Sequence, residues 1–361
     1  MASATESPAT LTPDANRAST QPQGEPPPTA VQPEPATIVP HIALLLPVSS
    51  SAFAQPAEAV QAGFLAAAKA QGWLPFPLRT YPVTDDTQQI LNGYRQAVAA
   101  GARVVVGPLT RDGVTALAGS DLVTAPTLAL NVPEGSAPMP RNMYTLSLQI
   151  EAEARQVARL AFSEGHLDAF TISGDTPLQR RMHQAFVREF TRLGGRHVAD
   201  YAFTTDTASL GRIKEAVALR VADMVFLALD FQRARVVRPY LDPLPIYATS
   251  QVYPGAGNPL AGADLANVRF LDMPWLLQPD HPAVMIYPRH DYGSAPDLDR
   301  LYALGIDAFR VVQELLAGRT HVALDGVSGR ITLGRDRHFV RELVSAQFSD
   351  GKLLVSGGPG P

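Results

Sequence analysis

Short apolar runs alternate with amphipathic stretches from residue 41 onward. The runs HIALLL (41–46), ARVVV (102–106) and DMVFLALD (223–230) are apolar at almost every position. Strands of this kind are buried on both faces, as in a parallel sheet that is covered by helices on each side. The stretches between them repeat apolar residues at spacings of three and four, which predicts helices. The pattern as a whole predicts an α/β fold.

This alternation occurs twice in succession. The first series has strands near 42–46, 76–83, 102–109 and 125–131, and the second has strands near 168–175, 196–203, 223–230 and 245–250. In the second series, Thr176 and Pro177 suit the N-cap and the first turn of a helix whose apolar face begins with Leu178 and Met182. Two consecutive α/β units of about 100 residues each predict two doubly wound, Rossmann-like lobes.

The rest of the chain contains too few predicted helices and strands to form a third domain. It contains one long amphipathic helix over 298–318 and late strands near 329–334 and 345–355. We therefore expect the chain to return and complete both lobes, with several crossings that form a hinge and leave a cleft between strand ends. The expected divisions are 41–147 plus about 278–326 for the first lobe, and 148–277 plus about 327–356 for the second.

The first 40 residues have a different composition. They contain nine prolines, with Ser, Thr, Ala and Gln between them, and too few apolar residues to form a core. Such a segment is expected to be disordered or partly polyproline-like. It has no basic region followed by an apolar one, as a signal peptide would. We interpret residues 1–40 as a tether.

Composition and charge exclude several classes of function. The formal net charge is −4 and there is no basic block, which argues against nucleic-acid binding. No apolar stretch approaches the 18 residues of a membrane span. The chain has no cysteine, and its eight histidines show no metal-ligand spacing, so neither a cofactor nor a metal is predicted. No G-x-S-x-G or phosphate-binding loop occurs, and we do not expect an enzyme.

Polar side chains follow most of the predicted strands. In open α/β sheets, ligands meet the carboxyl ends of strands, and hydroxyls with carboxylates there could hold a polar zwitterion. The candidate cleft residues are Ser49, Ser50, Thr110, Asn131, Asp175, Asp230, Thr249 and Ser250.

Each of these residues also has a purely structural explanation. The serines, Thr110, Asp175 and Asp230 precede predicted helices and could simply cap them. Asn131 could close a turn. Trp275, in the segment MPWLL, could be an exposed docking anchor or could pack inside the hinge.

Several segments, taken together and in order, resemble the penicillin-binding protein activator family. The most specific are YATSQ (247–251), DMPWLL (272–277) and ALGIDAF (303–309), and the resemblance runs from about residue 41 to 355. It implies a fold like that of type I periplasmic binding proteins. It also implies a periplasmic protein, tethered to the outer membrane, that binds and stimulates a class A penicillin-binding protein in peptidoglycan synthesis. Membrane contact is expected only through a lipid anchor, which this sequence does not carry.

Two functions therefore remain open. The first is a non-catalytic module that activates a peptidoglycan synthase through its lobe surfaces, with a cleft that needs no small ligand. The alternative is a solute-binding receptor of an ABC-type transporter, which would hold an amino acid or a related polar molecule in the cleft.

Overall fold

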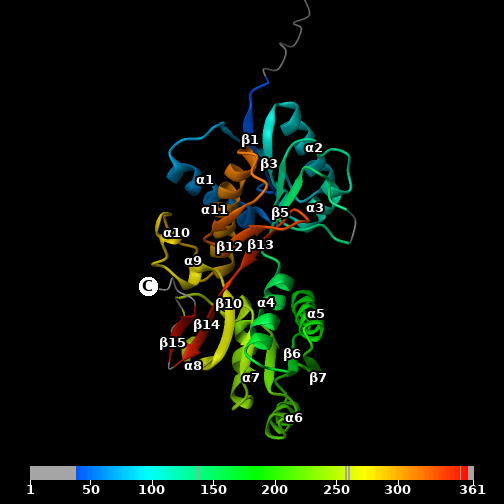
Figure 1. The fold of residues 1–361 in the computed structure, drawn as a ribbon, viewed down its shortest axis with the longest axis vertical. Helices are drawn as coiled ribbons and strands as arrows, with labels where there is room; N and C mark the ends of the chain where they lie inside the picture. Colours follow the sequence, from blue (N-terminus) through cyan, green and yellow to red (C-terminus); the bar gives the residue numbers. More distant parts are fainter. Residues whose placement is uncertain (1–37, 136–137, 257, 259–260, 350, 357–361) are drawn as a thin grey trace, which may run out of the picture. The chain divides into compact units, whose positions relative to one another are not determined.

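The structure is a computed structural model that describes residues 38–135, 138–256, 258, 261–349 and 351–356. Residues 1–37 of the expected Pro-rich arm lie outside these ranges. The described chain forms two sheets, each with helices on both faces (Figure 1). This confirms the predicted α/β class with two doubly wound lobes.

The first sheet has eight strands in the order β11-β12-β13-β5-β4-β3-β1-β2. Strands β1 to β5 are parallel to their neighbours, β13 joins β5 in parallel, and β11 to β13 form antiparallel pairs. Their bounds are β1 His41–Leu46, β2 Leu78–Pro82, β3 Ala102–Val106, β4 Thr127–Ala129, β5 Met143–Leu146, β11 Ala323–Asp325, β12 Arg330–Leu333 and β13 His338–Glu342.

The second sheet has seven strands in the order β15-β14-β10-β9-β8-β6-β7. Strands β6 to β10 pair in parallel, and β14 and β15 extend the sheet as antiparallel strands. Their bounds are β6 Asp168–Ser173, β7 Arg196–Ala202, β8 Met224–Ala228, β9 Ile246–Ala248, β10 Val268–Asp272, β14 Val344–Ser349 and β15 Lys352–Ser356.

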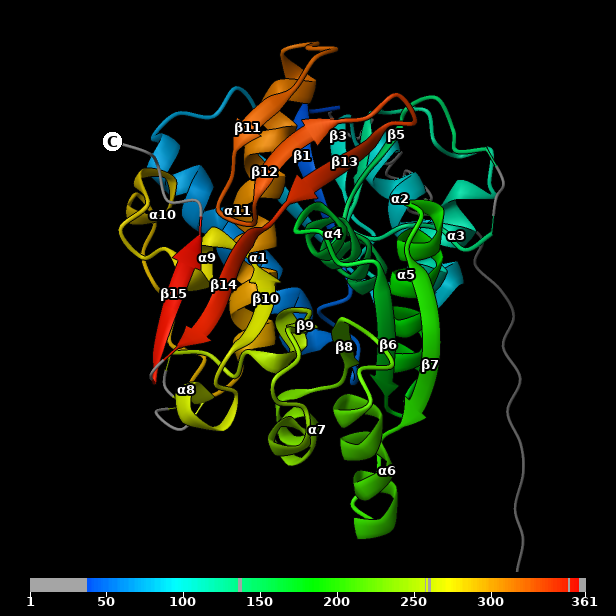
Figure 2. The same ribbon diagram turned by 60° about the horizontal axis from the view of Figure 1, so that its bottom comes forward.

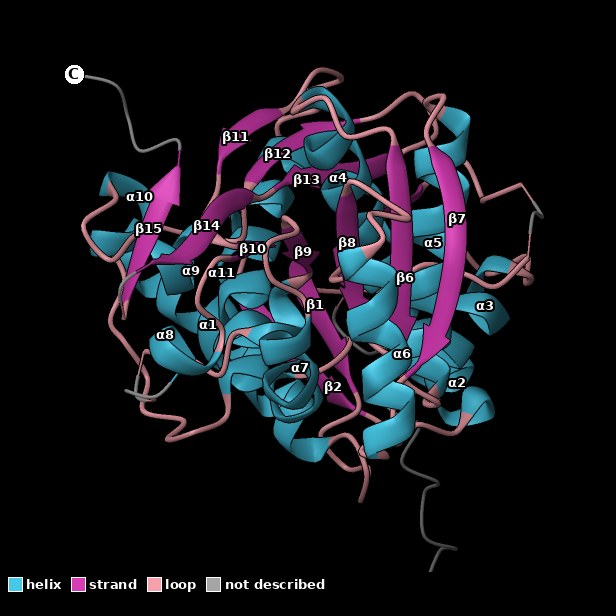
Figure 3. Ribbon diagram, turned by 90° about the horizontal axis from the view of Figure 1, so that it is seen from below, coloured by secondary structure: helices cyan, strands magenta, loops and turns pink. Residues whose placement is uncertain are grey.

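Helices cover both faces of each sheet (Figure 3). On the first sheet, α1 (Ala54–Gln71) and α11 (Pro296–Leu316) lie on one face, and α2 (Thr87–Ala99) and α3 (Arg111–Ala118) on the other. On the second sheet, α4 (Ile150–Ser163) and α5 (Pro177–Arg192) lie opposite α6 (Thr207–Ala218) and α7 (Phe231–Val237). The short helices are η1 Arg238–Tyr240, η2 Ser250–Val252, α8 Ala261–Asp264, α9 Pro274–Leu277 and α10 Pro282–Met285.

Strand β1 shows why the central strands are apolar throughout. Ile42, Leu44 and Leu46 belong to the core beneath α1 and α11. Ala43 and Leu45 belong to the core beneath α2 and α3. Because successive side chains point to opposite faces of a sheet, a strand between two helix layers needs apolar residues at every position.

Helix α5 begins at its predicted cap, Thr176. The Thr176 side chain accepts a hydrogen bond from the backbone N–H of Gln179, and the Gln179 side chain accepts one from the backbone N–H of Thr176. Pro177 begins α5. The Asp86 side chain caps α2 by accepting a hydrogen bond from the backbone N–H of Gln89. These short polar side chains satisfy backbone N–H groups that have no partner within the helix.

The chain passes between the two sheets three times: after β5, after β10 and after β13. The prediction that residues from about 327 onward join the second lobe is wrong for β12 and β13. Both strands belong to the first sheet, because β13 pairs with β5, and Ile331 and Phe339 are buried in the core of the first lobe. The last crossing follows Glu342, where β13 continues into β14 (Figure 2).

Within the described ranges, none of the helices combines the length and the apolar character that a membrane crossing requires.

Candidate functional site

A cleft of about 570 Å³ lies where the carboxyl ends of strands from both sheets come together. The first lobe lines it with the starts of α1 and α11 and with residues that follow β2, β3 and β4. The second lobe lines it with the start of α4, the start of α5 and the residues after β9. A larger hollow of about 1080 Å³ lies beside the last crossing, but it is not at these strand ends. We take the strand-end cleft as the candidate site, because ligands of open α/β sheets bind there.

Three of the predicted residues line this cleft: Thr110, Asn131 and Ser250. Thr110 accepts a hydrogen bond from the Gly113 N–H and caps α3. The Asn131 amide donates to the carbonyl oxygen of Leu109 at 3.1 Å. The tertiary structure thus brings these polar groups together, but each has an internal partner.

The two serines after β1 lie outside the residues that line the cleft. Ser49 is exposed. Ser50 is buried, and its hydroxyl donates to Asp85 at 2.6 Å while accepting from the N–H groups of Ala52 and Phe53. The hydrogen bond from Ser50 lowers the pKa of Asp85, which does line the cleft.

The other predicted residues of the second lobe also lie outside this lining. Asp230 caps α7 and forms an ion pair with Arg233 at 2.6 Å, as the capping explanation predicts. Asp175 is exposed, and Thr176 rather than Asp175 caps α5. Thr249 is buried against the sulfur of Met182.

Sequence reasoning missed a buried ionic cluster at the cleft, whose lining includes Glu153 and Arg300. Glu153 of α4 is buried and accepts a hydrogen bond from the Ser250 hydroxyl at 2.7 Å. Burial, together with the nearby charge of Asp272, raises the pKa of Glu153 to about 7, against the opposing effects of Arg341 and Arg300. The available signal was a glutamate on the apolar face of α4, next to Ala154 and one turn before Val157.

Arg300 of α11 belongs to the same cluster. Its guanidinium contacts both carboxylate oxygens of Asp272, at 3.2 and 2.7 Å, and donates to the carbonyl oxygens of Ser250 and Tyr253. Burial alone would lower the pKa of Arg300, but the carboxylate of Asp272 holds it above its ordinary value. Arg300 and Asp272 therefore join the first lobe to strand β10 of the second.

A second set of charges connects the lobes across the cleft. Glu151 of α4 forms ion pairs with Arg181 of α5 at 3.0 Å and with Arg111 of α3 at 3.6 Å. The oxygen Oε2 of Glu151 is buried and has no hydrogen-bond partner within the described chain. Most of the charge in the cleft is thus neutralised by other residues of this protein.

Trp275 lies at the crossing after β10 and is fully buried in the core of the first lobe. The Arg289 guanidinium lies over its ring, 3.9 Å from the centroid, and Tyr302 packs beside it. A side chain in this position is not an exposed docking anchor. It packs where the chain leaves the second sheet.

Two doubly wound lobes, three crossings and a strand-end cleft define a protein of the periplasmic-binding-protein-like class. The match to a family model agrees, since the model described as "LppC putative lipoprotein" covers residues 34–351. The chain belongs to this LppC lipoprotein family. The family resemblance predicted from the sequence is therefore confirmed.

Individual relatives and solved structures support the same assignment. A curated relative from Photobacterium profundum, named penicillin-binding protein activator LpoA, is 24% identical over 86% of this chain and 56% of its own length. The LpoA (YraM) C-domain from Haemophilus influenzae, described as a regulator of PBP1A, has a TM-score of 0.72 at 22% identity, with 88% of this chain and 100% of that chain covered. At this identity the likeness shows the fold alone.

A further solved structure has a different description. It comes from Chromobacterium violaceum, is described as "a putative branched-chain amino acid ABC transporter", and is 41% identical with a TM-score of 0.73. The match covers 86% of this chain and 99% of that one. The chain spans about half the length of the curated relatives it matches.

Proposed function

We propose that this protein is a non-catalytic, periplasmic interaction module that binds a class A penicillin-binding protein and stimulates peptidoglycan synthesis. The observation that carries the proposal is the family match over 34–351, a range that contains strands of both lobes, together with curated relatives named as activators. The lipoprotein description of the family supports a location in the periplasm with a tether to the outer membrane.

The geometry of the cleft supports an activator rather than a receptor. A receptor for a zwitterion needs carboxylates and donors that are free to meet the ligand. Here Glu151 is paired with two arginines, Ser250 with Glu153, and Asn131 with a backbone carbonyl. The contact with the synthase is therefore assigned to the lobe surfaces.

The direct test uses the purified chain with the class A penicillin-binding proteins of the same organism. We expect one of them to be retained in a pull-down, and its glycan polymerisation or crosslinking to rise when the chain is added. The variant Glu151→Gln should still be retained in the pull-down, because it changes a residue of the cleft and leaves the outer surfaces of the lobes as they are. Absence of both binding and stimulation with every class A synthase of the organism would refute the proposal.

A second candidate function is a solute-binding receptor for an amino acid or a related polar molecule. Two observations favour it: the unpaired Oε2 of Glu151 in the cleft, and the description of the 41% identical structure from Chromobacterium violaceum. A thermal-shift screen with amino acids and muropeptides separates the two functions. When the ligand is present at 100 times its dissociation constant, the free energy of unfolding of a receptor rises by about 2.7 kcal/mol. The melting temperature then rises by several degrees, and Glu151→Gln should abolish this rise. The activator proposal predicts no shift with any of these compounds.

A further inference from the structure

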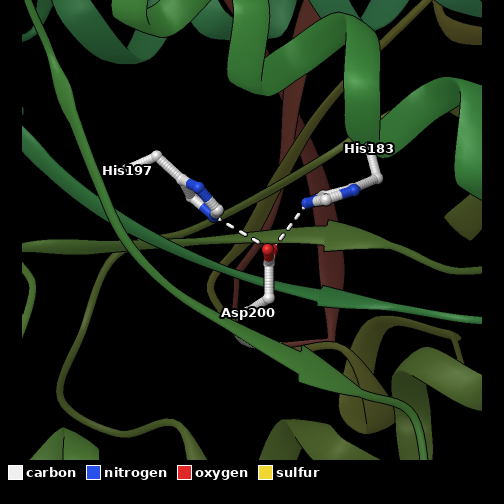
Figure 4. A group of neighbouring side chains, drawn as sticks. All are labelled: His183, His197 and Asp200. Atoms are coloured by element: carbon white, nitrogen blue, oxygen red, sulfur yellow. Dashed lines mark hydrogen bonds and ion pairs between the residues drawn. The ribbon is translucent and has the colours of Figure 1, made fainter.

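Two histidines and an aspartate, none of which lines the cleft, meet at the edge of the second sheet. His183 comes from α5, and His197 and Asp200 from the edge strand β7 (Figure 4). The Asp200 oxygen Oδ1 lies 2.6 Å from the His183 Nε2 and 3.0 Å from the His197 Nε2. The two imidazole nitrogens and the carboxylate oxygen therefore all point toward one another.

A bulge in β7 creates this arrangement. Residues three apart in a regular strand point to opposite faces, so His197 and Asp200 should diverge. The pairing register with β6 shifts here, since Ala169 pairs with His197 but Phe170 pairs with Ala199. The extra residue, Val198, turns both side chains toward the face that α5 covers. Bulges commonly re-aim side chains in this way beside functional sites.

The surroundings hold the carboxylate in place and leave it accessible. The Thr171 hydroxyl, on the neighbouring strand β6, donates to Asp200 Oδ1 at 2.5 Å. The side chains of His183 and His197 are 19% and 17% exposed, whereas Asp200 is 55% exposed. Within the described chain, Asp200 forms ion pairs with these two imidazoles alone.

We propose that His183, His197 and Asp200 form a binding site for a divalent transition-metal ion such as zinc. The three ligand atoms lie within 4.8 Å of one another. In a tetrahedral zinc site, bonds of about 2.0–2.1 Å separate ligand atoms by about 3.3 Å. Small side-chain rotations therefore suffice to enclose an ion, and the ion would replace the imidazole–carboxylate hydrogen bonds.

The ligand set determines the class of metal. Imidazole nitrogen suits zinc and its neighbours in the first transition row, whereas calcium and magnesium require mostly oxygen ligands. Three protein ligands leave a fourth position of a tetrahedral ion for water. The sequence did not reveal the site, because His183 and His197 come from different elements and approach each other only through the packing of α5 on β7.

Competition against a chromophoric zinc chelator tests the site in metal-depleted protein. We expect one zinc ion per chain, a rise of a few degrees in Tm on zinc addition, and visible absorption bands of a four-coordinate ion when cobalt replaces zinc. His183→Gln, His197→Gln and Asp200→Asn should each weaken zinc binding at least about tenfold.

The matched control is His166→Gln. His166 lies in the same lobe beside a single carboxylate, that of Asp223 at 3.6 Å, and its loss should leave zinc affinity unchanged. Circular dichroism of each metal-free variant confirms that it is folded. The proposal is overturned if the wild type binds no zinc in this assay, or if the double variant His183→Gln/His197→Gln binds zinc as tightly as the wild type.

Discussion

Glu153 shows how one residue of the cleft can belong to a cluster of buried charges. Its carboxyl group accepts a hydrogen bond from the Ser250 hydroxyl and lies near the charges of Asp272, Arg341 and Arg300. Burial favours the uncharged form, since an ionised carboxylate loses its hydration there. The raised pKa of Glu153, about 7, is the measurable sign of this environment.

The raised pKa of Glu153 predicts that the protein becomes less stable as the pH rises toward 7. The folded protein holds the Glu153 proton up to about pH 7, whereas the unfolded chain releases it near its ordinary value of 4.5. The contribution of Glu153 to the free energy of unfolding is therefore fully present below pH 4.5 and is lost as the pH rises to about 7. Glu153→Gln does not titrate, so it does not show this loss. Between pH 4.5 and about 7, the free energy of unfolding of the wild type should therefore fall relative to that of the variant by up to about 3 kcal/mol.

Urea unfolding of both proteins at several pH values measures that difference. The control is Glu58→Gln, which changes an exposed glutamate on α1 and should run parallel to the wild type. A Glu153→Gln variant whose stability follows the wild type at every pH would contradict the assignment.

At the scale of elements, the packing of α1 against α11 depends on two glycines. A Cβ atom at Gly63 would lie 1.9 Å from the Tyr302 carbonyl oxygen, and one at Gly305 would lie 2.0 Å from the Val60 carbonyl oxygen. No side chain fits at these distances. The two helix backbones can approach each other this closely only because Gly63 faces the backbone of α11 and Gly305 faces the backbone of α1. Figure 1 shows the two helices side by side. Their joint apolar face forms much of the core of the first lobe.

Gly305→Ala should therefore destabilise the protein although alanine is the better helix former. We expect a loss of at least about 2 kcal/mol in the free energy of unfolding, because the added methyl group forces α1 and α11 apart. Gly211→Ala on α6 is the matched control, since a Cβ there meets nothing within 4 Å. It should stabilise the protein by about 0.5–1 kcal/mol. Similar effects of the two substitutions in thermal or urea unfolding would disprove the close packing.

At the scale of the whole molecule, the ion pair between Arg300 and Asp272 connects the lobes in addition to the three crossings. Both side chains are almost completely buried, at 6% and 1% exposure. A buried pair of this kind adds little net stability over an apolar pair, but the loss of one partner leaves the other charge without compensation. The pair therefore sets how the lobes meet more than how strongly the protein resists unfolding.

Arg300→Met should cost about 3–5 kcal/mol in the free energy of unfolding, because Asp272 then stays buried without its partner. The double variant Arg300→Met/Asp272→Leu should recover a large part of that loss. As a control, Arg319→Met removes an exposed ion pair with Glu314 and should change stability by less than about 1 kcal/mol. If the double variant is no more stable than Arg300→Met, the buried pair does not have this role.

The candidate site was only partly predictable. Of the polar residues that follow the strands, the sequence could not distinguish Thr110, Asn131 and Ser250, which reach the cleft, from Thr249 or Asp230, which do not. The direction of a side chain after a strand depends on the loop conformation, for which the apolar pattern contains no signal. Glu153 could have been noticed as a charge on an apolar helix face, but its partners lie far away in the sequence.

The sequence by itself determined the elements, the two lobes and the family, because hydrophobic period, helix caps and ordered family segments are all local properties of the chain. The tertiary structure decided the features that depend on contacts between residues far apart in the sequence. It placed β12 and β13 in the first sheet through β5, and it buried Glu153 beside Arg300. It also brought His197 to Asp200 through a bulge in β7, and His183 to both through the packing of α5. These outcomes follow from contacts between residues far apart in the chain, whose burial and register no local pattern specifies.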